Sequence, residues 1–270
     1  MTLADEGSTV LGWVSIACWI VVYSPQIAEN YQLKSGEGLS VIFVIIWLLG
    51  DLCNIVGSIL AGLLPTIIIL GLYYTLCDMT LLFQIYYYRI CYDAGLQPLP
   101  SDNNPSAGTE STPLLAKKED VVSLSKRTKV IAYSAAVIFV IGTGVVAWIV
   151  ARAKGTDGND NGREEDIIEW KSQVIGWCSA LLYLGSRIPQ ILKNRKTYCS
   201  GLSIALFIFA VAGNATYVGS ILFKSLEAKH LIANASWLMG SGGTIFLDFI
   251  VLGQFIYYRN KRALARASVE

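Results

Sequence analysis

Residues 24–40 read SPQIAENYQLKSGEGLS, and residues 188–203 read IPQILKNRKTYCSGLS. The chain therefore contains one motif twice, and each copy begins with a Pro-Gln pair inside an apolar stretch of helix length. A membrane unit that occurs twice, with a first helix broken by proline, is typical of transporters whose binding site lies between the two copies.

The two copies also end alike, which indicates that a whole unit is duplicated. One set of residues recurs at a constant spacing: Asp78, Gln84, Tyr87, Tyr88 and Arg89 return as Asp248, Gln254, Tyr257, Tyr258 and Arg259. Each unit thus runs from the apolar stretch before the Pro-Gln pair to a Tyr-Tyr-Arg sequence.

The composition is that of a membrane protein. Hydrophobic residues make up 54% of the chain and charged residues 15%, whereas a soluble domain carries about 25% charged residues. A net charge of +1 without a basic stripe argues against nucleic-acid binding. The single histidine, His230, excludes a His-based metal site, and no G-x-S-x-G, P-loop or H-E-x-x-H motif occurs. We expect neither an enzyme nor a protein with a metal or another cofactor.

A helix needs about 20 apolar residues to cross the hydrocarbon layer of a membrane. Two polar stretches, residues 92–128 and 152–170, are predicted loops. The predicted fold is an all-α membrane protein with seven transmembrane helices, over residues 9–29, 39–61, 64–90, 129–151, 171–193, 202–223 and 233–258.

Lys and Arg concentrate on the cytosolic side of membrane proteins. Here they predominate after both Pro-Gln motifs, in the first long loop and near the C-terminus, so the N-terminus is predicted to be lumenal and the C-terminus cytosolic. Both units carry their basic loops on the same side, so they are parallel and require a connecting helix between them. The predicted order is a three-helix unit (1–91), a flexible cytosolic loop (92–128), a connector helix (129–151), a lumenal loop (152–170), a second three-helix unit (171–260) and a cytosolic tail (261–270).

Pro25 and Pro189 each remove a backbone donor from a helix and crowd the carbonyl four residues before them. Gln26 and Gln190 are placed to satisfy the broken backbone or a neighbouring helix. Two equivalent breaks favour hinges that bend during transport. The alternative is a pair of static kinks, which are common in membrane helices.

Asp78 and Asp248 are predicted to lie near the middle of the membrane. Each precedes an arginine by eleven residues, a distance of about 16 Å along a helix. A charge at that depth costs at least about 2.5–3.5 kcal/mol, so such residues face a cavity or a partner. They are candidates to bind a substrate cation or a proton; alternatively, one pairs with Arg187 or stays protonated.

A third acid shares a helix face with an aromatic and an amide side chain. Trp47, Asp51 and Asn54 lie on one face of the second predicted helix, and Asn214 and Tyr217 are the counterparts of the last two in the second unit. This polar face predicts the wall of a central cavity. The alternatives are hydrogen bonds between helices for the polar residues and plain packing for Trp47, which could otherwise stack on a planar cation.

The chain resembles the PQ-loop transporters, the relatives of cystinosin and of the SWEET sugar transporters. Within that family it looks most like the lysosomal and vacuolar cationic amino-acid branch. The residues that carry the resemblance are the two Pro-Gln motifs, WLLGDLCN at 47–54, SRIPQ at 186–190 and WLMGS at 237–241. The resemblance implies hinges at the Pro-Gln pairs and a cavity lined by the second helix of each unit.

The charges inside the predicted helices favour a cationic substrate. Three acids, Asp51, Asp78 and Asp248, face one base, Arg187. An unpaired carboxyl in hydrocarbon favours its neutral form, and a cationic ligand favours the ionised form. A proton and a cation therefore compete for the same carboxyl. Arg187 itself could pair with an acid, hold a substrate carboxylate or reach the cytosolic edge.

Glu110, Leu114 and Leu115 match an acidic dileucine signal in the predicted cytosolic loop 92–128. Such signals bind sorting adaptors and direct proteins to lysosomes or vacuoles. We thus expect a transporter in the lysosomal or vacuolar membrane that exports arginine, lysine and, as a third candidate, histidine by alternating access. Its expected partners are the cationic amino acid, protons, lipid and adaptors. The alternatives are a proton-coupled carrier of cystine or another neutral solute, with sugar less favoured, and a nutrient-sensing scaffold of the same fold.

Overall fold

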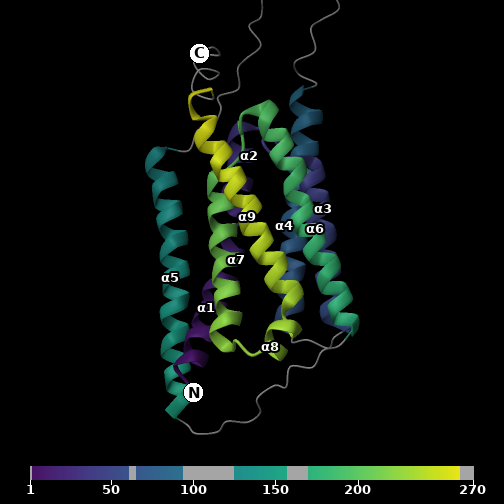
Figure 1. The fold of residues 1–270 in the computed structure, drawn as a ribbon. Helices are drawn as coiled ribbons and strands as arrows, with labels where there is room; N and C mark the ends of the chain where they lie inside the picture. The colour runs from purple at the N-terminus through teal and green to yellow at the C-terminus, as the bar shows by residue number, and fades with distance from the viewer. Residues whose placement is uncertain (1, 61–64, 94–124, 157–169, 262–270) are drawn as a thin grey trace, which may run out of the picture.

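The computed structural model describes residues 2–60, 65–93, 125–156 and 170–261, and these ranges are all α-helical apart from short turns. The sorting signal at Glu110, Leu114 and Leu115 and most of both long loops lie outside the described residues. The helices (Figure 1) are α1 Leu3–Val21, α2 Ser24–Leu33, α3 Val41–Leu60, α4 Pro65–Asp93, α5 Lys126–Thr156, α6 Trp170–Thr197, α7 Ile204–Lys224, α8 Ala228–Ala233 and α9 Ala235–Tyr257.

The long helices form an upright bundle with two distinct ends (Figure 1). One, here called the α8 end, holds the starts of α1 and α6 together with α8. The other, the α2 end, holds α2 and the last turns of α4, α6 and α9. Helices α1, α3 and α4 run up, down and up between these ends, and α6, α7 and α9 do the same.

In the described part of the chain, six helical segments are long and apolar enough to cross a membrane. The expected span at 171–193 is helical, as α6, but is not among the six. Its polar and charged side chains, which include the buried Ser179, Ser186, Arg187 and Gln190, lower its hydropathy. Helices α5 and α6 also extend beyond their predicted spans, because a helix can continue past the apolar stretch that hydropathy detects.

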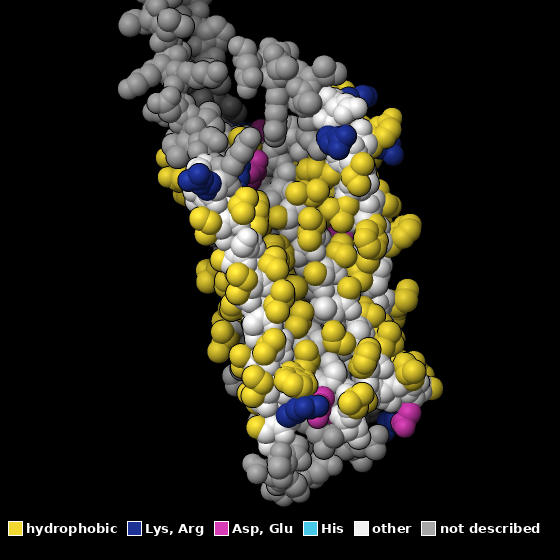
Figure 2. All heavy atoms as spheres, turned by 90° about the vertical axis from the view of Figure 1, so that its left-hand side faces the viewer, with side chains coloured by type: hydrophobic (Ala, Val, Ile, Leu, Met, Phe, Trp, Pro, Cys, Tyr) yellow, Lys and Arg dark blue, Asp and Glu magenta, His cyan; other side chains and the backbone are white. Residues whose placement is uncertain are grey.

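Hydrophobic side chains cover the middle of the outer surface, as expected for a protein surrounded by lipid. Figure 2 shows the face on which α5 lies, where most Lys, Arg, Asp and Glu side chains gather near the two ends. Ile131, Ile138 and Ile141 of α5 are largely exposed. An outer surface of this kind predicts that the bundle spans the hydrocarbon layer.

The two Pro-Gln motifs have different backbones. The chain breaks between α1 and α2, with Pro25 in the first turn of α2, where a proline fits a helix. The Ser24 hydroxyl donates to the carbonyl of Val21, 2.7 Å away. In contrast, α6 continues through Pro189 without a break.

The first helix of each set packs on the second helix of the other set: α1 on α7, and α6 on α3. Glycines allow this close approach, because a Cβ on Gly50 would lie 2.8 Å from the Tyr183 ring and one on Gly213 would lie 2.9 Å from Trp19 Nε1. Helix α5 packs outside this arrangement, against α1. The buried aromatic core, which includes Phe43 and Phe207, fills the half of the bundle nearer the α2 end.

Candidate functional site

A cavity of about 460 Å³ lies inside the bundle, enclosed by α1, α3, α4, α6, α7 and α9. Small-molecule sites have volumes of about 300–1,000 Å³. The cavity extends from Tyr23 and Arg187 at its inner end to Ser220 and Ser236 near the α8 end. Both sets of helices form its walls, as expected for a site between two copies.

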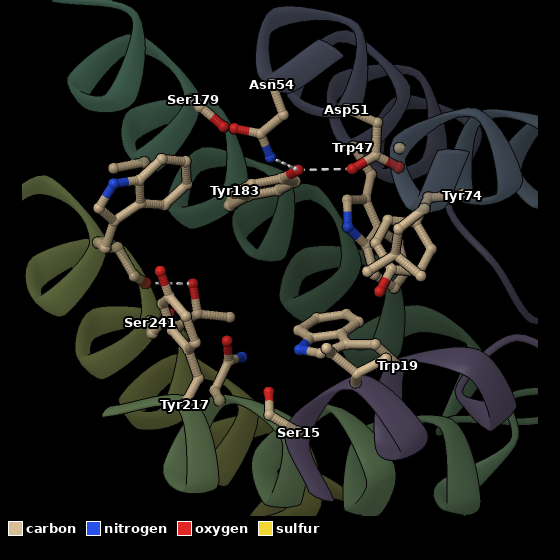
Figure 3. Close-up of a pocket in the computed structure, with 18 of the residues that line it drawn as sticks. Ser15, Trp19, Trp47, Asp51, Asn54, Tyr74, Ser179, Tyr183, Tyr217 and Ser241 are labelled. Atoms are coloured by element: carbon tan, nitrogen blue, oxygen red, sulfur yellow. Dashed lines mark hydrogen bonds between the residues drawn. The ribbon is translucent and has the colours of Figure 1, made fainter. Parts of the chain in front are cut away.

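Most residues predicted to bind substrate line this cavity, and several are labelled in Figure 3. They are Trp47, Asp51, Asn54, Asn214 and Tyr217. Asp78 and Asp248 are fully buried and are not among the residues that line it. The predicted hinge residues Pro25, Gln26, Pro189 and Gln190 lie at the α2 end.

Asp51 is the acid of the cavity wall, and its carboxylate is held by two tyrosines. The Tyr183 hydroxyl donates to Asp51 Oδ1 at 2.5 Å, and the Tyr23 hydroxyl lies 3.4 Å from Oδ2. Asn54 Nδ2 donates in turn to the Tyr183 oxygen at 2.5 Å (Figure 3). This chain of donors directs the Asn54 carbonyl oxygen away from it, and that atom has no partner among the described residues. The wall therefore contains a carboxylate, a charged acceptor for a cation.

Asp78 lies directly behind Asp51. The two carboxyl groups interact with each other, and neither Asp78 oxygen has a hydrogen-bond donor among the described residues. Two facing carboxylates repel, so the pair is stable when it shares a proton or binds a cation.

Asp248 forms a buried ion pair with Arg187. Arg187 Nε lies 3.0 Å from Asp248 Oδ1, and the two side chains are 1% and 0% exposed. Arg187 also donates from Nη1 to Ser186 Oγ at 3.0 Å. Of the alternatives that the sequence left open, Arg187 thus pairs with an acid and does not reach the surface.

The Trp47 ring already contacts a planar cation in this structure. The guanidinium carbon of Arg187 lies 4.8 Å from the centre of this ring, and Tyr23 stacks on the same tryptophan at 5.1 Å. Trp47 is accordingly part of the inner end of the cavity and holds Arg187 in place.

The wall opposite Asp51 presents a donor. Asn214 is 5% exposed, and its Nδ2 has no hydrogen-bond partner in the part of the chain that the structure describes. Nearby hydroxyls are committed to helix backbones: Ser15 donates to Gly213 and Thr244 to Gly240. Asn214 lines the cavity, so its amide has unused hydrogen-bonding capacity in the cavity wall.

Besides Trp47 and Tyr217, which the sequence predicted, five further aromatic residues line the cavity. They are Trp19, Tyr23, Tyr74, Tyr183 and Trp237. An aromatic residue in an apolar helix looks like ordinary core. A comparison of the two copies carries a signal, because Trp19 and Tyr183 occupy the same place relative to the two Pro-Gln pairs.

The α2 end is closed by four hydrogen bonds between the two sets of helices, here called the glutamine cross-bonds. Each glutamine reaches the loop of the other set rather than the backbone around its own proline. The bonds are Gln26 Nε2 to Gly201 O (3.0 Å), Ser203 N to Gln26 Oε1 (2.7 Å), Gln190 Nε2 to Gly38 O (3.1 Å) and Ser40 N to Gln190 Oε1 (2.7 Å).

The backbones of Gly38 and Gly201 touch between these bonds, and a Cβ on Gly38 would lie 2.0 Å from the Gly201 carbonyl oxygen. The cavity is thus separated from the α2 end by packed backbone and buried amides.

The chain is similar to a known protein family and to several transporters. Residues 7–67 and 172–230 each match the PQ loop repeat family. The vacuolar lysine transporter YPQ1 of Saccharomyces cerevisiae is 38% identical, over 94% of this chain and 94% of that protein. The vacuolar histidine transporter YPQ3 of the same yeast is 36% identical, over 94% and 93%. The human lysosomal amino acid transporter 1 homolog is 30% identical, over 96% and 85%.

Proposed function

The chain belongs to the PQ loop repeat family, and from this premise we propose that it transports cationic amino acids across a lysosomal or vacuolar membrane. Its substrates are lysine, arginine and histidine, the amino acids after which its yeast relatives are named. The observation that carries the proposal is a cavity between the two units with an acid, Asp51, in its wall. Its relatives are transporters, so the expectation that the chain is not an enzyme is confirmed.

Seven helices cross the membrane in the proposed arrangement: α1 with α2, then α3 and α4, the connector α5, and α6, α7 and α9. Helix α6 is the seventh crossing, although its composition is more polar than that of the others. Its polar residues support this assignment because they are buried against other helices, so lipid does not meet them.

The α8 end faces the lumen and the α2 end faces the cytosol in this proposal, as the distribution of Lys and Arg predicts. The cavity then opens from the lumenal half, and the glutamine cross-bonds close the cytosolic half. Export requires those bonds to break while the α8 end closes, with Pro25 and Pro189 as the points of bending. Protons from the acidic lumen compete with the substrate for the carboxyl groups.

The cavity also orients the substrate. The cationic end of the substrate binds Asp51 and the carbonyl oxygen of Asn54. The carboxylate of the substrate accepts a hydrogen bond from Asn214 Nδ2. These two walls come from opposite units, so a bound amino acid connects them.

Uptake into proteoliposomes tests the function. We expect labelled lysine to accumulate, and arginine and histidine to compete with it more strongly than cystine or glucose do. Strong competition by cystine or glucose, with none by arginine, would instead support the carrier of a neutral solute. Absence of uptake for all of them, with binding retained, would support a nutrient-sensing scaffold.

Asn214→Leu tests the orientation. We expect the affinity for lysine to fall about tenfold, the loss of one hydrogen bond to a charged group. The affinity for lysinamide, which lacks the carboxylate, should change much less. Competition against labelled lysine measures both, and Thr143→Val on α5, which does not line the cavity, is the control. Equal losses for lysine and lysinamide would contradict the proposed orientation.

A further inference from the structure

The inner end of the cavity holds a cation that belongs to the protein itself. The Arg187 side chain is 1% exposed and lines the cavity together with Asp51. Its guanidinium is the same chemical group that an arginine substrate carries. Arg187 can therefore compete with a substrate for any acid within its reach.

Two acidic sites lie near this guanidinium, on helices that surround it. Asp248 on α9 accepts its Nε hydrogen at 3.0 Å. Asp51 on α3 lines the same cavity as Arg187, one helical turn from Trp47, on which the guanidinium stacks. In this structure the guanidinium bonds to Asp248 and stacks on Trp47, so Asp51 remains open to the cavity.

The acid that Arg187 binds determines the charge of the cavity. With Arg187 on Asp248 that pair is neutral, and Asp51 with Asp78 keeps a net negative charge when they share one proton. With Arg187 on Asp51 that negative charge would be cancelled, and a cationic substrate would lose its partner.

We infer that Asp248 is a positioning residue that keeps the Arg187 guanidinium away from Asp51, and that this ion pair determines the preference for cationic over neutral substrates. The inference rests on the proposed function, because it assumes that Asp51 binds the substrate cation. Specificity then depends on two things: Asp51 binds the substrate cation, and Arg187 is prevented from binding Asp51.

Arg187 can separate from Asp248 because few hydrogen bonds join the two side chains. Asp248 holds it through one hydrogen bond, from Nε to Oδ1, and Asp248 Oδ2 has no partner among the described residues. A single bond holds a guanidinium less firmly than a two-bond fork does. Loss of the Asp248 charge would leave a buried cation uncompensated, and Asp51 would be the acid that it turns to.

Arginine and citrulline provide the test, because citrulline is a neutral molecule of nearly the same shape. The affinity of each for the purified full chain in proteoliposomes is measured by competition against labelled arginine, for four proteins: wild type, Asp248→Asn, Asp248→Glu and the double variant Arg187→Gln/Asp248→Asn. In Asp248→Asn we expect the affinity for arginine to fall about tenfold or more while that for citrulline changes little. The double variant should regain the wild-type preference, and Asp248→Glu should keep it.

Each outcome supports or overturns the proposed role of Asp248. An unchanged preference in Asp248→Asn, or a double variant that keeps the defect, would overturn the inference while the proposed function stands. If the wild type itself shows no preference for arginine over citrulline, the proposed function falls, and this inference with it. Should Asp248→Asn fail to fold, Asp248→Ser releases Arg187 in a second way and is judged by the same preference.

Discussion

Asp51→Asn is expected to reduce the affinity for lysine and arginine by at least about thirtyfold, equivalent to about 2 kcal/mol, because the cation loses its charged partner in a buried site. An amide keeps the shape of the side chain and can still accept from Tyr183, whose hydroxyl lies 2.5 Å from Asp51 Oδ1. The change therefore removes the charge and leaves the hydrogen bond possible.

Concentration-dependent uptake of labelled lysine measures this effect, and Glu227→Gln on the exposed start of α8 is the control. Thermal stability is a second measurement that separates binding from folding. Because the Asp51–Asp78 pair is stable when it shares one proton, an amide at position 51 adds no repulsion, and the variant should be about as stable as the wild type. Unchanged lysine affinity in a stable Asp51→Asn protein would remove Asp51 from the substrate site.

Gly38→Ala is expected to reduce lysine uptake more than about tenfold. Overpacking would destabilise, by about 1–3 kcal/mol, the conformation in which the α2 end is closed. The new Cβ would lie 2.0 Å from the Gly201 carbonyl oxygen and 2.1 Å from its carbonyl carbon. Both are backbone atoms, so no side chain can move aside. The loops must separate, and the neighbouring glutamine cross-bonds would stretch with them.

Gly253→Ala in α9 is the matched control, since a Cβ there meets nothing within 4 Å. The double variant Gln26→Leu/Gln190→Leu should also lose uptake, because it removes all four cross-bonds without adding a clash. Wild-type uptake by both Gly38→Ala and the glutamine variant would show that closure of this end is not part of the transport cycle.

The sequence does not predict which partners the buried charged residues have. Asp78 and Asp248 occupy equivalent positions in the two copies, and the sequence treats them alike. In the fold, Asp248 pairs with Arg187, whereas Asp78 faces Asp51. The difference arises because the counterpart of Arg187 in the first copy is Tyr23, which has no charge to offer.

The glutamines of the Pro-Gln motifs show the same limit. Their sequence context pointed to broken backbone nearby or to a neighbouring helix, and the structure places their amides on the loop of the other unit. Ser24 is the residue that satisfies the carbonyl of Val21. A bond between residues so far apart in the chain depends on how the two units meet, and a single motif carries no information on that.

By itself, the sequence determined the features that depend on composition and order along the chain: a duplicated membrane unit, apolar helices, acids deep inside them, and a family. Only the tertiary structure decided which acid lines the cavity, which acid holds Arg187, and which tyrosines bind Asp51. The physical reason is that helix rotation and packing select contacts over a few ångströms between residues distant in sequence. The energy of a buried charge depends on those contacts, because lipid and core supply no water to replace them.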